Sequence, residues 1–336
     1  MELAYNLDAA FTRWVVTQAY LQEPFVLVDV GVQHGEHPRW HQLGKYLIVH
    51  GFDAVKEAID ELTRRNAGKR NRHYHWIAAG AMDEERTFHF NPANPTASSM
   101  YPHGQSRFDT VAGQELRKVQ VRRLDTLFDE GVLPRADFLK IDVEGYEQDV
   151  LRGAGKLLET GVLGVEAESN FGISPTYPNG HLVALHEILL QHRLLAFDMG
   201  FNRIPRASFQ RALVRSGHKA VAGEDKVGKP AKLDVLFCRD PIDETDHPEN
   251  YRTPSQPLSL DQLIKLTIVH ELHGLNDIAV DTVERFAERL KARLDTEHAI
   301  RLLADPHCRP GPLRRFFRNA RRSLRRRLRA GMRPAE

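Results

Sequence analysis

Residues 137–145, DFLKIDVEG, form a mostly apolar run that ends in two acids and a glycine. A second run, FVLVDVGV at residues 25–32, has the same apolar, β-branched character and also reaches a glycine. Continuous runs of this kind are typical of strands that are buried on both faces, as in a parallel sheet. The two runs therefore predict two buried strands with polar residues at their carboxyl ends.

Outward from these runs, strand-like and helix-like segments alternate. Further strands are predicted at residues 45–52, 73–81, 162–169, 194–199 and 232–239, with a short β pair around 86–90. Helices are predicted at residues 54–65, 147–159 and 181–192. Strands separated by helices indicate βαβ units, so we expect an α/β fold with a seven-stranded, doubly wound sheet.

The sequence divides into five parts. The predicted parts are an N-terminal helix (1–22), the α/β domain (23–240), a linker rich in Pro, Asp and Glu (241–257), a helical appendage (258–306) and a basic tail (307–336). Apolar residues recur at helical spacing on both sides of Gly274, which predicts two amphipathic helices too small to form a core of their own. We expect these helices to pack either on the main domain or on a second copy, as a homodimer.

The composition places the chain among ordinary globular proteins. Of its 336 residues, 41% are hydrophobic and 27% are charged, which excludes wholesale disorder. No run of about 18 apolar residues is present to span a membrane. Two cysteines, Cys238 and Cys308, cannot build a disulfide framework, and the first residues do not resemble a secretory signal. We therefore expect a cytoplasmic protein.

The net charge of +2 conceals a strong asymmetry. From Arg309 onward there are eleven arginines and one acid, about +10, which leaves about −8 for residues 1–308. Because an acidic body repels the phosphates of a nucleic acid, no specific nucleic-acid partner is expected. In the tail, residues 313–329 place Leu and Phe on one helical stripe among arginines, which predicts binding to an anionic membrane surface, at its inner face. The alternatives are docking on the acidic body, a partner-binding helix or a disordered tail that attracts nucleic acid.

The first strand continues into a loop with two glycines, Gly31 and Gly35. Glycines allow the backbone to turn tightly and to approach a ligand closely. Their G-x-x-x-G spacing departs from the G-x-G-x-x-G fingerprint of dinucleotide sites, which argues against a nucleotide-dependent oxidoreductase. Asp53 follows about 20 residues later, where a carboxylate can accept both hydroxyls of a ribose or cap the following helix.

Several stretches resemble the FkbM-type S-adenosylmethionine-dependent methyltransferase family over about residues 20–240. They are LVDVGVQHGEHPRW, GFDAV, VRRLDTLFDEG and, most specifically, ADFLKIDVEGYEQDVLRGA. The resemblance implies a class I methyltransferase (Rossmann-like) fold whose last strand, here 232–239, is antiparallel. It also implies S-adenosylmethionine as cofactor and O-methylation of a hydroxyl of a sugar in a glycan, glycolipid or related natural product. The acceptor would be a carbohydrate or a glycolipid.

The same resemblance assigns roles to individual residues. The implied cofactor-binding residues are Asp29, Gly31, Gln33, His34, Gly35, Asp53, Ala79, Ser99 and Asp142. Among these, Asp53 would hold the ribose, Ala79 would line the adenine with Ala78, and Ser99 belongs with Ser98 to a serine-containing stretch of the family.

The implied reaction needs a group that takes a proton from the acceptor hydroxyl. Asp142 and Glu144 point to the same side of their strand because side chains alternate, and Glu168 follows a neighbouring strand. Asp142 is the first candidate for the base or a metal ligand, with Glu144 and Glu168 as partners and His186 as an alternative base. The three carboxylates offer hard oxygen ligands for Mg²⁺, or a hydrogen-bonding set for sugar hydroxyls.

Two further interpretations stay open. His270 and His273 are three residues apart rather than four, so they do not form a metalloprotease motif and are expected to be ordinary helix residues. The chain also fits a non-catalytic scaffold or interaction protein with a methyltransferase fold, whose helical appendage would bind the partner.

Overall fold

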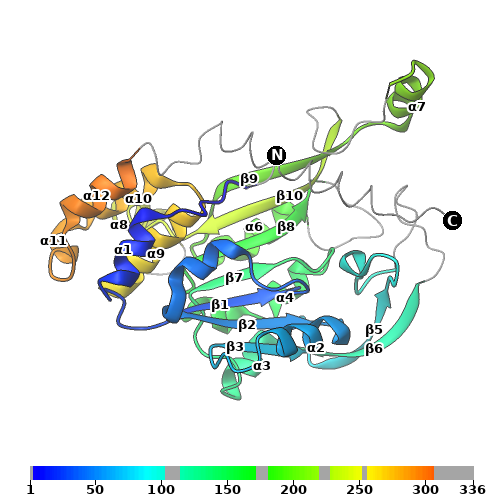
Figure 1. Cartoon of the computed structure of the whole chain (residues 1–336), viewed down its shortest axis with the longest axis horizontal. Helices are drawn as coiled ribbons and strands as arrows, with labels where there is room; N and C mark the ends of the chain where they lie inside the picture. Colours follow the sequence, from blue (N-terminus) through cyan, green and yellow to red (C-terminus); the bar gives the residue numbers. More distant parts are fainter. Residues whose placement is uncertain (1–2, 103–113, 172–180, 219–227, 252–255, 306–336) are drawn as a thin grey trace.

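The computed structural model describes residues 3–102, 114–171, 181–218, 228–251 and 256–305. Within them, seven strands form one sheet in the order β3-β2-β1-β7-β8-β10-β9 (Figure 1). The strands are β1 (Phe25–Val30), β2 (Leu47–Asp53), β3 (Arg72–Trp76), β7 (Phe138–Ile141), β8 (Gly164–Asn170), β9 (Leu195–Ile204) and β10 (Lys229–Cys238). The first five of these pair in parallel, whereas β10 is antiparallel to both β8 and β9. The predicted seven-stranded sheet and its antiparallel 232–239 strand are confirmed.

Helices cover both faces of this sheet. The helices of the described residues are α1 (Ala10–Thr17), η1 (Pro38–Tyr46), α2 (Lys56–Arg65), η2 (Pro95–Ala97), α3 (Leu124–Asp129), α4 (Glu147–Arg152), α5 (Gly155–Glu159), α6 (Leu182–Gln191), α7 (Ala207–Arg215), α8 (Asp243–Asp246), η3 (Pro248–Asn250), α9 (Leu260–Leu272), α10 (Asn276–Arg285), α11 (Ala287–Leu290) and α12 (Thr296–Ala304), of which α7 does not contact the sheet. The predicted helix 147–159 is divided into α4 and α5, because Gly153 approaches the backbone of Gly80 too closely for any side chain.

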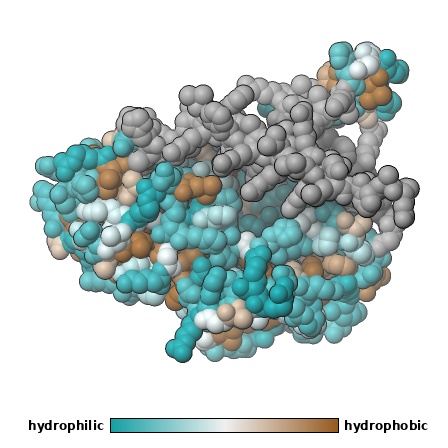
Figure 2. All heavy atoms as spheres, viewed as in Figure 1, coloured by the Kyte–Doolittle hydropathy of each residue, from teal (hydrophilic) through white to brown (hydrophobic). Residues whose placement is uncertain are grey.

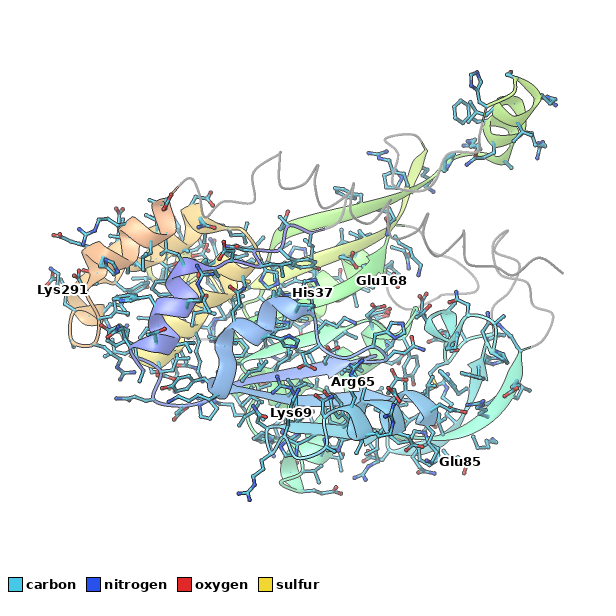
Figure 3. All side chains as sticks on the ribbon, viewed as in Figure 1. His37, Arg65, Lys69, Glu85, Glu168 and Lys291 are labelled. Carbon is cyan, nitrogen blue, oxygen red and sulfur yellow. The ribbon has the colours of Figure 1, made fainter. Side chains whose placement is uncertain are left out.

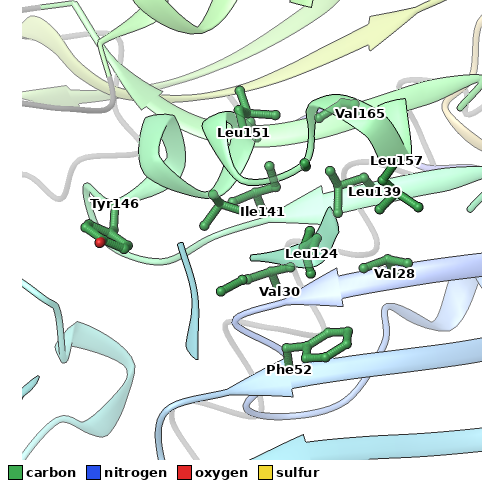
Figure 4. Packing of buried hydrophobic residues seen from close by; sticks show 14 of the residues in the cluster. Val28, Val30, Phe52, Leu124, Leu139, Ile141, Tyr146, Leu151, Leu157 and Val165 are labelled. Carbon is green, nitrogen blue, oxygen red and sulfur yellow. The ribbon is translucent and has the colours of Figure 1, made fainter. Parts of the chain in front are cut away.

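Alternation along the strands sends successive side chains to opposite faces. On one face, Val28 and Val30 of β1, Leu139 and Ile141 of β7 and Val165 of β8 pack with leucines of α3, α4 and α5 (Figure 4). All five side chains are almost completely buried. This face therefore forms the larger of the hydrophobic clusters.

The opposite face packs against α1, η1 and α9. Phe25 and Leu27 of β1 and Phe138 of β7 lie there, with Trp40 of η1 stacked between the two phenylalanines. The ring centroids of Trp40 lie 5.3 Å from Phe25 and 4.8 Å from Phe138. The sheet is thus doubly wound, as predicted.

A second, three-stranded sheet corrects one predicted strand. It contains β4 (Ala78–Ala79), β5 (Glu84–Phe90) and β6 (Glu115–Arg122), in the order β4-β6-β5. The sequence predicted a single strand over 73–81, but β3 ends at Trp76 and the next residues turn away, with Ile77 N donating to His75 O. Ala78 and Ala79 then pair with β6 instead of β2. The predicted β pair around 86–90 is confirmed by β5.

Helix α9 is buried on both of its sides, whereas the sequence predicted an amphipathic helix with a polar face. Eleven of its thirteen residues are buried. One side packs on the sheet, and the other is covered by α1, α10 and neighbouring segments of the same chain. Several of its enclosed polar residues find partners, as when Lys265 Nζ donates to Asp137 Oδ2 (2.9 Å) and to Pro24 O (2.7 Å). Since this chain itself covers α9, the apolar stripe that suggested a homodimer is already occupied.

The predicted linker, 241–257, contains ordered structure in its described part. It carries α8 and η3, and the Arg239 guanidinium makes a buried, two-pronged ion pair with Glu244. Tyr251 Oη donates to Asp243 Oδ2 at 2.6 Å. These contacts fasten residues 239–251 to one another, so the Pro- and acid-rich composition does not mark an unstructured link here.

The hairpin of β9 and β10 forms an arm that carries α7 away from the body (Figure 1). No residue of α7 is buried, and Phe209 and Val214 are 41% and 61% exposed. In Figure 2 this helix shows hydrophobic atoms at the end of the arm, whereas most of the visible surface is hydrophilic. Among the described residues, no helix combines the length and hydropathy needed to cross a membrane. The tail 307–336, including the 313–329 stretch, lies outside the described residues, so its membrane binding stays a prediction.

Replacing Glu271 tests the capping of α1 from a distance. The Glu271 carboxylate accepts from Phe11 N (2.9 Å), Thr12 N (2.8 Å) and Thr12 Oγ1 (2.7 Å), and so satisfies the first turn of a helix that has no side-chain cap. We expect Glu271→Gln to lower the free energy of unfolding by about 2 kcal/mol, because an amide has a single acceptor oxygen. Urea denaturation measures this. The exposed Glu288→Gln is the control, and equal midpoints for the two variants would contradict the capping role.

Three stacked histidines make the fold sensitive to acid. Burial, together with His73 and His75, lowers the pKa of His50 to about 3, and its Nδ1 lies 3.3 Å from His75 Nε2. Because an unfolded histidine titrates near 6.5, the stabilising contribution of neutral His50 is fully present above that pH and is lost as the pH falls toward 3. We expect His50→Phe to remove about 2 kcal/mol of the loss in unfolding free energy between pH 7 and pH 5. Urea midpoints at the two pH values check this, and a drop as large as in wild type would refute it.

Candidate active site

A pocket opens at the carboxyl ends of the central strands, where open α/β sheets bind ligands. Its wall comes from the segments after β1 and β2, from β4 and β5, and from the loop after β7. The lining residues are Val30, Gly31, Gln33, Phe52–Val55, Ile77–Ala79, Phe88, Pro95, Thr96, Ser98, Met100, Asp142–Glu144 and Tyr146. The pocket is therefore apolar along one wall and carboxylate-bearing along the other.

The loop after β1 touches the loop after β7 at Gly31. Its φ is +82°, and an added Cβ would lie 1.9 Å from the carbonyl oxygen of Asp142. Only glycine fits such a close approach of two backbones. The contact brings the predicted cofactor loop and the predicted catalytic loop to one pocket. It also requires glycine at position 31 whether or not a ligand binds.

Asp53 joins two loops at the pocket wall. Its Oδ1 accepts from Val55 N (2.8 Å) and its Oδ2 from Gln33 N (3.0 Å). The N-cap residue of α2 is Val55, which has no side-chain cap, so Asp53 makes a turn before the helix instead of capping it. A carboxylate offers about four acceptor positions, and two remain after these bonds. Burial raises the pKa of Asp53.

Asp29 lies under the pocket and not on its wall. It faces the Lys140 ammonium across the strand pair, with 3.8 Å between Oδ1 and Nζ. Burial raises the pKa of Asp29 to about 6, and its Oδ1 accepts no hydrogen bond from the described residues. A buried carboxylate oxygen without a hydrogen-bond donor is costly, and the nearby Lys140 ammonium offsets part of that cost.

Three carboxylates meet at the edge of the pocket. Oxygen atoms of Asp142, Glu144 and Glu168 lie within 4.8 Å of one another. Figure 3 shows Glu168 at the end of β8. Two lysines balance them in part: Lys140 Nζ is 3.2 Å from Asp142, and Lys232 Nζ is 2.6 Å from Glu144 and 3.1 Å from Glu168. The three predicted catalytic acids are thus neighbours, as their positions at adjacent strand ends imply.

The backbone of this carboxylate cluster is held in an uncommon conformation. Glu144 has a φ of +54°, which costs energy for a residue other than glycine. Ser99 Oγ donates to the Glu144 carbonyl at 2.8 Å, and Glu147 Oε1 accepts from Val143 N and Gly145 N. These bonds stabilise the turn that directs Glu144 to the pocket.

Burial and like charge raise the proton affinity of Glu168. Burial is the largest cause of its raised pKa, and Asp142 and Glu144 add to it, while Lys232 opposes it. For Lys232, burial alone would lower the pKa, but Glu168 and Glu144 override it and raise the pKa. The shifts favour the protonated form of both groups, so the lysine keeps its charge and Glu168 holds a proton more tightly than an isolated glutamate does.

A second polar layer lies deeper on the same face of the sheet. Glu166 of β8 lies in register with Lys140 of β7 and accepts from Arg39 and from Tyr5 Oη (2.9 Å). His273 Nε2 of α9 lies 3.2 Å from Glu166 Oε2. Burial would raise the pKa of Glu166, but Arg39, His273 and Lys140 together outweigh it and lower the pKa. His273, expected to be an ordinary helix residue, is thus a buried partner of this carboxylate.

Six predicted site residues do not line the pocket: Asp29, His34, Gly35, Ser99, Glu168 and His186. His34 is exposed, and its carbonyl oxygen accepts from Arg65 Nη2. Ser99 is buried and bonds the Glu144 loop, while its neighbour Ser98 lines the pocket. His186 corrects the prediction of an alternative base: it packs on Phe237, which faces the opposite side of the sheet from Glu168 because side chains alternate.

Sequence reasoning missed several residues of this site. Tyr146 lines the pocket and belongs to the same KIDVEGYE stretch, so its neighbourhood was a usable signal. Phe88 and Met100 reach the wall from β5 and from the segment after η2; the sequence predicted a β pair at 86–90 but not that this part of the chain would line the pocket. Lys232 alternates with Asp234 on the last strand, and that polar pair within an apolar run was the available signal.

Comparison with known protein families matches residues 29–187 to the model of the methyltransferase FkbM domain. A search of curated proteins finds no match. Solved structures similar to this chain include the methyltransferase FkbM from Methylobacillus flagellatus KT (15% identity, 63% of this chain, 43% of that one, TM-score 0.37). Others are N-methyltransferase NodS from Bradyrhizobium japonicum WM9 (9%, 69% and 98%, TM-score 0.32) and 1,6-didemethyltoxoflavin-N1-methyltransferase from Burkholderia thailandensis (14%, 69% and 80%, TM-score 0.30).

The structural similarities are too low to carry an argument about chemistry. The chain also spans less than half the length of the Methylobacillus protein. The family match, at residues 29–187, covers the strands and loops that line the pocket.

Removing the Asp53 carboxylate tests the cofactor role of the pocket. We expect Asp53→Ala to weaken the binding of S-adenosylmethionine and S-adenosylhomocysteine by tenfold or more, because a hydrogen-bonded buried carboxylate is worth about 1.5–3 kcal/mol. Isothermal titration calorimetry measures both ligands. Asp60→Ala, on the exposed face of α2, is the matched control, and unchanged affinity in Asp53→Ala would exclude Asp53 from the site.

Proposed function

The chain belongs to the FkbM methyltransferase family through residues 29–187, and from this premise we propose that it is an S-adenosylmethionine-dependent O-methyltransferase. Its acceptor is a hydroxyl of a sugar in a glycan, glycolipid or related natural product. The observation that carries the proposal is that Asp53, Asp142 and Glu144 line one pocket, and that Glu168 adjoins the last two in a carboxylate cluster.

The residues present fit S-adenosylmethionine. Asp53 has acceptor capacity left for ribose hydroxyls, and Ala78, Ala79 and Phe88 offer an apolar wall for a flat base.

The carboxylate cluster supports a hydroxyl acceptor. When bound, S-adenosylmethionine supplies a methyl group on a sulfonium, and its transfer to a hydroxyl releases one proton. Glu168 accepts that proton on a carboxylate oxygen, since its pKa is raised and a stronger base removes the proton more effectively. Glu144 and Asp142 accept hydrogen bonds from further hydroxyls and orient the acceptor.

Replacing Glu168 tests the proposal. With radiolabelled S-adenosylmethionine and panels of oligosaccharides and glycolipids, wild type should transfer label to an alkali-stable methyl ether. We expect Glu168→Gln to lower the rate about 100-fold with little change in cofactor affinity, because a positioned base contributes that much. Glu187→Gln, an exposed residue of α6, is the control.

The alternatives predict different results. Cofactor binding without transfer to any acceptor, or no cofactor binding at all, would favour the non-catalytic scaffold. Transfer to amines rather than hydroxyls would keep the methyltransferase and reject the sugar acceptor.

A further inference from the structure

Lys232 occupies the centre of the carboxylate cluster. Its Nζ lies 2.6 Å from Glu144 Oε2 and 3.1 and 3.2 Å from the two oxygens of Glu168. One ammonium therefore binds two of the three carboxylates that otherwise form the candidate set for a metal ion. The third, Asp142, has its own cation in Lys140.

The fold, and not a flexible chain, brings Lys232 to this place. It lies on β10, which is paired on both sides, to β8 and to β9. In the β8 register, Lys232 stands opposite Asn170 and Asp234 opposite Glu168, so Lys232 is the diagonal neighbour of Glu168 on the same face. The adjacent Leu233 is buried in the opposite face, which fixes the orientation of the strand.

A divalent ion in this cluster would need the same carboxylate oxygens. Mg²⁺ and Mn²⁺ bind carboxylates directly at about 2.1 Å, so an ion shared by Glu144 and Glu168 requires Lys232 to leave. The ammonium also cancels the negative charge that would attract the ion. The Mg²⁺ site expected from the three acids therefore does not fit the residues that surround them.

We propose that Lys232 is the built-in cation of the Asp142–Glu144–Glu168 cluster: it positions Glu144 and Glu168 for the acceptor and excludes divalent metal from the site. The claim that Lys232 positions the carboxylates for an acceptor rests on the proposed function, whereas the claim that it excludes divalent metal does not. Lys232 is a positioning residue. It keeps its proton throughout and exchanges no atom with the acceptor.

Manganese titration followed by electron paramagnetic resonance tests the exclusion of metal on the full chain without cofactor. The variants are Lys232→Gln, Lys232→Arg and the double variant Lys232→Gln with Glu168→Gln. Lys229→Gln, on the same strand, is the control. We expect Lys232→Gln to bind Mn²⁺ at least tenfold more tightly than wild type, and the double variant to lose that gain. Lys232→Arg, which retains the charge, should behave as wild type.

Two results would overturn the proposal. One is tight binding of Mn²⁺ by wild type at this cluster, shown by its loss in Glu168→Gln. The other is equally weak binding by wild type and Lys232→Gln, since the lysine would then exclude nothing. Thermal unfolding of each variant confirms that folding is not the cause of a difference.

The catalytic part is separated from the proposed function by two further readouts. Titration with S-adenosylmethionine should give the same affinity for wild type and Lys232→Gln, because Lys232 does not line the cofactor pocket. With an acceptor in hand, wild-type transfer should be unchanged by EDTA, while Lys232→Gln should lose at least tenfold in kcat and recover with Lys232→Arg. Loss of wild-type activity in EDTA would refute the inference. Absence of cofactor binding in wild type would refute the proposed function and leave the manganese result to decide the role of Lys232.

Discussion

The site depends on one close contact between two backbones. Gly31, after β1, lies so near the Asp142 carbonyl, after β7, that a Cβ atom would be 1.9 Å from that oxygen. Because these loops touch, Gln33 N reaches Asp53, and the carboxylates that follow β7 face the same pocket. A side chain at position 31 would separate the loops and, with them, Asp53 from the carboxylate cluster.

The sheet distributes polar and apolar residues by alternation. One face of β1, β7 and β8 is apolar and packs on helices α3 to α6. The other carries Asp29, Lys140 and Glu166 in a row across three strands, and the carboxylate cluster beyond them. Buried charges are tolerated only when they are paired, and α9, η1 and the N-terminal segment supply those partners. The helices after residue 258 are thus part of the support of the site.

Local patterns predicted the strands well because burial on both faces leaves a continuous apolar signature. The runs 25–32 and 137–145 and the helix 54–65 are all present. The same patterns failed where the decision was not local. Ala78–Ala79 pair with a second sheet, His186 packs on the face of the sheet opposite Glu168, and α9 is enclosed on both sides. Each of these outcomes depends on which other segments pack against the residues concerned.

The sequence by itself determined the parallel core, the glycine loop and the order of acids at the strand ends, since these follow from hydrophobicity, backbone freedom and alternation along one chain segment. The resemblance of the same residues to a family supplied the expected cofactor. Only the tertiary structure decided that Lys232 lies among the three carboxylates and that Ser99 supports Glu144. Such contacts join residues 45 to 88 positions apart, and their charge and hydrogen-bond partners exist only once the strands are aligned in register.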